Sequence, residues 1–166
     1  MPENSFDDLL AANRDFASTF DLAGFDGIAR AGVAMVTCMD SRIDPLAMIG
    51  LQPGDAKILR NPGGRVTDRA LVAVVLGVTL LQVDRVLVVP HTRCAMASAP
   101  EEELRRRVGE VTGTDASWMS LGAIDDQEKT LVADVHRILS HPLVPDHVQV
   151  GGFLYDVDTG LLTQKV

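Results

Sequence analysis

Residues 85–94 read RVLVVPHTRC, an apolar run that leads directly into a histidine and, three residues later, a cysteine. The residues before the proline have the β-branched, uninterrupted apolar character of a strand that is buried on both faces. An equivalent run at residues 33–37 ends at Cys38, the other of the chain's 2 cysteines. Because functional groups gather at the carboxyl ends of parallel strands, we expect Cys38, His91 and Cys94 to meet at one edge of a sheet.

Strands and helices alternate along the rest of the chain and predict an α/β fold, with a mostly parallel β-sheet core flanked by helices. The expected strands are residues 33–37, 56–59, 85–89 and 147–155, and the expected helices are residues 5–20, 45–50, 68–82, 100–108 and 125–140. Thr67 is a good N-cap for the third of these helices. The residues after a turn signal at 158–160 can pair back as a hairpin.

With 166 residues the chain is long enough for one buried core and too short for two ordinary domains, so we expect a single domain. Residues 1–31 would form a helical arm with its connector, and residues 32–166 the catalytic core. Large apolar residues recur along the helix of the arm: Phe6, Leu9, Leu10, Phe16 and Phe20. This stripe packs either on the chain's own core or across a partner subunit, and the sequence leaves both open.

The composition excludes several classes of partner. The formal net charge of −8 disfavours nucleic acid and anionic membranes, and no basic stripe offsets it. The longest apolar run, residues 70–81, is shorter than the roughly 20 residues of a membrane span. The N-terminus lacks the basic start and apolar stretch of a secretory signal, which predicts a cytoplasmic protein. In that reducing compartment we expect free thiols or metal ligands, with a Cys38–Cys94 disulfide as the less favoured alternative.

Two thiolates and one imidazole are ligands that zinc takes, and three protein ligands leave one position for water, as in catalytic sites. Cys38, His91 and Cys94 therefore predict a catalytic site for one Zn²⁺ per chain. Asp40 and Arg42 follow the first cysteine closely. Asp40 can accept a hydrogen bond from water at the open position, or coordinate the ion as a conditional fourth ligand. Arg42 can hold Asp40 off the metal through a bidentate pair.

A glycine pair follows the second expected strand. Gly63 and Gly64 either let the backbone approach a small linear substrate, with amide hydrogens near its oxygens, or form a tight turn into the next helix. Ser41 is a further candidate for substrate binding. His136 and His141, by contrast, have no cysteine or acidic cluster at ligand spacing, and we interpret them as structural or surface residues.

These motifs together resemble those of the β-class carbonic anhydrases. That family holds zinc through a cysteine in Cys-x-Asp-x-Arg, here residues 38–42, and through a His-x-x-Cys pair, here residues 91–94. The similarity extends to Arg-Asn-Pro-Gly-Gly at residues 60–64 and is greatest to the short, compact members. It implies reversible hydration of carbon dioxide to bicarbonate and a proton by zinc-bound hydroxide, oriented by the Asp40–Arg42 dyad. It also implies a homodimer or a higher multiple of dimers, with the N-terminal helix reaching the neighbouring subunit.

The chain departs from the usual family pattern at Pro62, Pro90 and Ala95. None of these departures removes a ligand, but all alter the walls of the pocket. A hydrolase of carbonyl sulfide or carbon disulfide on the same zinc is therefore the nearest alternative. A non-catalytic module that binds a nucleotide or another anion is the alternative from another class, although the Gly-x-Gly-x-x-Gly and P-loop patterns are absent. A redox role, in which the cysteines cycle between thiol and disulfide, is the third.

Overall fold

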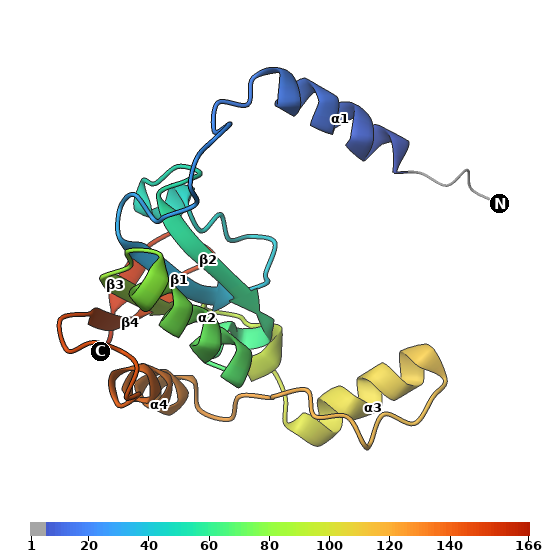
Figure 1. Ribbon diagram of the computed structural model, residues 1–166. Coiled ribbons are helices and arrows are strands. Elements are labelled where there is room, and N and C mark those ends of the chain that lie inside the picture. The colour runs from blue at the N-terminus through green and yellow to red at the C-terminus, as the bar shows by residue number, and fades with distance from the viewer. Residues whose placement is uncertain (1–5) are drawn as a thin grey trace.

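The computed structural model describes residues 6–166, and these residues build a five-stranded sheet in the order β2-β1-β3-β4-β5 (Figure 1). Four strands run parallel: β1 (Val33–Cys38), β2 (Ala56–Asn61), β3 (Arg85–Val89) and β4 (Gln149–Tyr155). The tail folds back as β5 (Leu162–Gln164), which pairs antiparallel with β4 as the predicted hairpin. The α/β fold with a mostly parallel sheet is thus confirmed, together with all four predicted strands.

The helices between the strands begin within two residues of their predicted starts. α2 (Asp68–Leu80) is capped by the Thr67 hydroxyl, which accepts a hydrogen bond from the Ala70 amide at 3.3 Å. α4 (Gln127–Leu139) follows the N-cap Asp126. α3 (Glu101–Thr112) is longer than expected, because the stop signal is a left-handed glycine at its C-cap. No helix within residues 6–166 has the length and hydropathy needed to cross a membrane.

Three short 3₁₀ turns complete the chain: η1 (Ala47–Ile49), η2 (Pro62–Gly64) and η3 (Ala95–Ala97). The short helix expected at residues 45–50 is present as η1, which is a single 3₁₀ turn. A left-handed glycine follows η1 immediately, so the segment cannot grow beyond a single turn.

The two faces of the sheet are buried by different means. On one face, strand residues such as Val36 and Val88 pack with α2 and α4 through Val74 and Ile138, all less than 2% exposed. On the other face, Met35, Val89 and Tyr155 pack with both cysteines and with side chains from η1 and the C-terminal tail. Because β1 and β3 are buried from both sides, their sequences are apolar at nearly every position rather than alternating.

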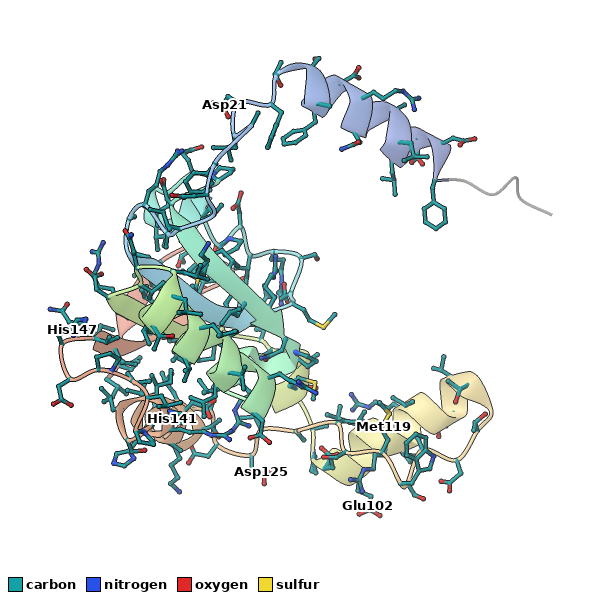
Figure 2. The ribbon with its side chains drawn as sticks, in the orientation of Figure 1. Asp21, Glu102, Met119, Asp125, His141 and His147 are labelled. Atoms are coloured by element: carbon teal, nitrogen blue, oxygen red, sulfur yellow. The ribbon has the colours of Figure 1, made fainter. Side chains whose placement is uncertain are left out.

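The N-terminal helix α1 (Asp7–Ser18) buries none of its residues. The five large apolar side chains of the stripe, three on α1 and one just beyond each end, are between 48% and 65% exposed, and Figures 1 and 2 show the helix standing away from the sheet. Packing of this stripe on the chain's own core, one of the two alternatives, is therefore wrong. The first residue of the predicted helix, Ser5, lies outside the described residues.

Residues 61–65, called the glycine loop below, cross the carboxyl ends of β1 and β3 in close contact with their backbone atoms. A Cβ atom on Gly64, whose φ is +65°, would lie 3.0 Å from the Cys38 amide nitrogen and 3.1 Å from the Val89 carbonyl oxygen. The Asn61 side chain spans the loop, since it accepts a hydrogen bond from the Arg65 amide and donates one to the Arg65 carbonyl. The loop is thus a packed part of the sheet edge.

The loop is also attached to α4 through an ion pair. Arg65 donates two hydrogen bonds to the Asp134 carboxylate, at 2.7 and 3.2 Å, and the Val66 amide donates a third at 3.0 Å. Asp134 is only 4% exposed, so its charge needs this full set of donors. The pair fixes the loop between the sheet and α4.

The close approach of Gly64 predicts a large loss of stability for Gly64→Ala. We expect a loss of roughly 2–5 kcal/mol, because left-handed strain adds to overpacking against backbone atoms that cannot move aside. Gly113→Ala is the matched control: its φ is +66°, and nothing lies within 4 Å of its added Cβ. It should lose only about 1–2 kcal/mol. Urea unfolding measures both, and equal losses would contradict the packing argument.

Candidate metal centre

Three side chains from two neighbouring strands converge at one edge of the sheet. Cys38 is the last residue of β1, and His91 and Cys94 follow the end of β3. β1 and β3 pair in parallel with Thr37 opposite Val89, so the segments that follow the two strands start at the same edge of the sheet. The ligand atoms of Cys38, His91 and Cys94 all lie within 4.8 Å of one another. The predicted convergence of these residues is confirmed.

The two sulfur atoms are 4.0 Å apart, and both cysteines are free and buried. A disulfide would need about 2.05 Å between the sulfurs, so the disulfide alternative does not describe this arrangement. Two sulfurs that each lie about 2.3 Å from a tetrahedrally coordinated ion are separated by roughly 3.8 Å. The spacing therefore fits a shared metal ion.

His91 is fully buried and presents one ring nitrogen to the cluster. Its Nδ1 lies 2.8 Å from the Thr92 carbonyl oxygen. Since a carbonyl can only accept, Nδ1 carries the hydrogen and Nε2 carries the lone pair. Nε2 is buried without a hydrogen-bond partner, and burial lowers the pKa of the ring, which favours the neutral form. A buried acceptor without a donor is the expected state of a metal ligand.

The electrostatics of the two thiols also indicate a metal site. Burial raises the pKa of the Cys94 thiol, and the adjacent Cys38 raises it further. Two thiolates this close, in a buried site, are favourable only with a cation between them. The set of two sulfurs and one imidazole therefore suits zinc.

Asp40 and Arg42 form a rigid pair beside the cluster. Arg42 Nε and Nη2 donate to the two Asp40 carboxylate oxygens at 2.9 and 2.8 Å, and the Arg42 amide donates at 3.0 Å. These hydrogen bonds hold the pKa of the carboxyl well below its usual range. Asp40 Oδ2 lies 3.7 Å from His91 Nε2, while the same oxygen is bonded to Arg42. Asp40 thus faces the cluster but is held by arginine, and its role as a conditional fourth ligand stays a prediction.

Two side chains that support the site were not singled out from the sequence. Arg60 Nε donates to the Cys38 carbonyl at 3.0 Å, and Gln127 Nε2 donates to the His91 carbonyl at 3.0 Å. Arg60 pairs in register with Thr37, so the parallel alignment of β1 and β2 could have identified it. Gln127 is the first residue of α4 and lies 36 residues after His91 in the sequence. No local pattern around Gln127 indicates its contact with the His91 carbonyl.

The remaining candidates lie as follows. Gly63 and Gly64 are buried in η2 at the same sheet edge, whereas Ser41 is exposed in the turn after Asp40. His136 is exposed on α4, and His141 lies just beyond the end of that helix (Figure 2); neither belongs to the group of converging ligand atoms. The interpretation of both histidines as structural or surface residues agrees with this placement.

Comparisons with known proteins agree on one family. A family model described as carbonic anhydrase matches residues 33–162. Beta-carbonic anhydrase 1 of Mycobacterium tuberculosis is 32% identical over 162 residues, which cover 95% of this chain and 96% of that protein. The crystal structure of carbonic anhydrase from Streptococcus mutans matches with a TM-score of 0.87 at 32% identity and covers 99% of both chains. A carbon disulfide hydrolase from Acidianus is 30% identical over 149 residues, or 75% of this chain and 72% of that protein.

The donor set predicts about one zinc per chain in the purified protein, measured by elemental analysis. Cys94→Ser keeps the size of the side chain but replaces the thiolate with a much harder and less acidic ligand, so we expect zinc affinity to fall at least about tenfold. His136→Ala, a histidine change away from the cluster, serves as the control and should bind zinc like the wild type. Unchanged affinity in Cys94→Ser, measured by competition with a chelating dye, would contradict the assignment.

Proposed function

Because this chain belongs to the β-carbonic anhydrase family, we propose that it catalyses the reversible hydration of carbon dioxide to bicarbonate and a proton. The observation that carries the proposal is the His91 Nε2, which is buried without a hydrogen-bond partner and lies within 4.8 Å of two buried cysteine sulfurs, with an arginine-bound carboxylate 3.7 Å away. Zinc, the metal of this family, would be held by Cys38, His91 and Cys94. When bound, it supplies a Lewis acid that makes a water molecule at the site more acidic.

The part of Asp40 in the reaction follows from its charge. Its lowered pKa keeps it ionised, so it can only accept hydrogen bonds. Accepting one from the attacking water directs an oxygen lone pair of that water at the carbon of carbon dioxide. Arg42 keeps the carboxylate in this orientation, because its planar fork engages both oxygens and its Nη2 also lies 3.3 Å from the Arg93 carbonyl.

For the substrate pocket we propose Ser41, Gly63 and Gly64. All three lie in segments that leave the carboxyl ends of β1 and β2, beside the metal ligands. Packing against β1 and β3 already explains the need for glycine at position 64. Its contribution to binding would therefore be made by the backbone of the loop, held in place by that packing.

A second candidate function is hydrolysis of carbon disulfide or carbonyl sulfide on the same zinc. The 30% identity to the carbon disulfide hydrolase from Acidianus supports this second function as an alternative. These substrates are linear, like carbon dioxide, and need the same nucleophile. The two functions differ in what the pocket admits, so direct comparison of turnover separates them.

We further propose that the protein works in the cytoplasm as a homodimer or a multiple of dimers. In this arrangement residues 1–31 form an arm and residues 32–166 the catalytic core of a single domain. The support is the stripe of five large apolar side chains along α1 and at its two ends, which the rest of residues 6–166 leaves exposed. A contiguous exposed apolar surface of this kind marks an interaction site. A second copy that packs against α1 would bury it.

Asp40→Asn should reduce the hydration rate about 100-fold or more, because the amide cannot replace a carboxylate acceptor held by Arg42. Zinc content should stay near one per chain. Asp146→Asn, an exposed carboxylate in the loop before β4, is the control and should keep full activity. Stopped-flow hydration with a pH indicator gives the rates.

The same assay decides between the two functions. Wild-type protein that hydrates carbon dioxide rapidly and leaves carbon disulfide and carbonyl sulfide intact supports the hydratase. The reverse preference would replace it with the hydrolase. Zinc-loaded protein that is inactive on all three substrates would contradict both.

Leu10→Asp should weaken the assembly, because a charge in the α1 stripe would have to be buried between subunits. Val111→Asp is the matched control, since Val111 lies on α3 and is 89% exposed, compared with 53% for Leu10. Sedimentation velocity over a range of concentrations should show dissociation of Leu10→Asp alone. A wild-type protein that sediments as a monomer at all concentrations would overturn the dimer.

A further inference from the structure

The peptide group between His91 and Thr92 is held from two sides by distant parts of the chain. Its carbonyl oxygen, from His91, accepts a hydrogen bond from Gln127 Nε2 at 3.0 Å. Its amide, from Thr92, donates to the Tyr155 carbonyl at 2.9 Å. Because a peptide group is planar, two bonds at opposite ends fix its rotation about the chain.

The orientation of this peptide determines where the His91 ring points. The ring donates from Nδ1 to the next carbonyl along the chain, that of Thr92, at 2.8 Å. The Thr92 hydroxyl is itself held, since it accepts a hydrogen bond from the Val157 amide at 3.1 Å. A rotation of the first peptide would move the Thr92 carbonyl and turn Nε2 away from the two sulfurs.

Within residues 6–166 the side-chain amide of Gln127 makes no hydrogen bond other than the one to His91. It is the first residue of α4, but the cap of that helix is the Asp126 carboxylate, which accepts from the Lys129 amide at 3.0 Å. The Gln127 side chain is half-buried and lines a small cavity between the glycine loop and α4. Its Nε2 faces a carbonyl, which can only accept, so chemistry assigns the donor end of the amide to His91.

We propose that Gln127 is a positioning residue for the metal ligand His91. It acts through the His91 carbonyl and touches neither metal nor substrate. The inference rests on the zinc site of the proposed function. It adds that α4 takes part in setting zinc affinity, although α4 contributes no ligand.

The test compares Gln127→Met and Gln127→Glu with the wild type. Met has a similar length but cannot donate a hydrogen bond, and Glu keeps the shape but presents an oxygen to the carbonyl. We expect zinc dissociation constants to rise about tenfold in Gln127→Met and further in Gln127→Glu, as for other groups that orient metal ligands. Gln149→Met, at an exposed glutamine that begins β4, should bind zinc like the wild type.

Two further readouts separate positioning from simple stability. The visible absorption of the cobalt-substituted protein should change in both Gln127 variants, because the ligand field follows the angle of the His91 ring. The melting temperature of the metal-free protein should stay within a few degrees of the wild type. Unchanged zinc affinity and an unchanged cobalt spectrum, with or without a loss of stability, would overturn the proposal. If Gln127→Met does not fold, Gln127→Glu gives the same readouts.

A failure of this inference can be distinguished from a failure of the proposed function. A wild-type protein that binds no zinc would end the zinc hydratase and this inference together. A wild-type protein that binds zinc tightly, and Gln127 variants that bind it equally well, would end only the role of Gln127.

Discussion

The parallel pairing of β1 with β3 is the constraint on which the site depends. The pairing ends with Thr37 opposite Val89. The residues that follow this pair on each strand carry Cys38 and Cys94, whose sulfur atoms are 4.0 Å apart. A shift of one residue in this register would turn the side chains of a strand to the opposite face. Burial from both sides makes such a shift costly, because apolar residues fill β1 and β3 on each face. The same strand register therefore determines both the packing of the core and the positions of the metal-binding side chains.

The sequence could predict the features that depend on runs of apolar residues and on the spacing of residues within a motif. The buried strands and the Thr67 cap follow from local patterns, and the parallel order brings Cys38, His91 and Cys94 together without further information. What could not be predicted depends on tertiary contact. The carbonyl of His91 meets Gln127 only because α4 packs beside the glycine loop, and no pattern near Gln127 indicates it. The exposure of α1 is similar, since an amphipathic stripe looks the same whether its own core or another molecule covers it.

Asp40 illustrates how the surroundings decide between two roles for one carboxylate. A carboxylate beside a metal can coordinate it, or it can remain free to accept a hydrogen bond from water. Arg42 favours the second role, because its three hydrogen bonds hold the carboxylate in place and leave Oδ2, which accepts only one of them, able to accept another from water. The Arg42 guanidinium also reaches the carbonyl of Arg93 in the loop between the ligands of β3. Arg42 thus connects the Asp40 carboxylate to the loop that carries His91 and Cys94.

The exposed α1 links folding to assembly. A helix of 12 residues that buries nothing is only marginally stable in water by itself. In the proposed dimer, contacts with a second copy would stabilise its helical form. The helix content of the protein then becomes a function of its concentration, so that dilution would melt the arm while the sheet and its metal ligands stay folded.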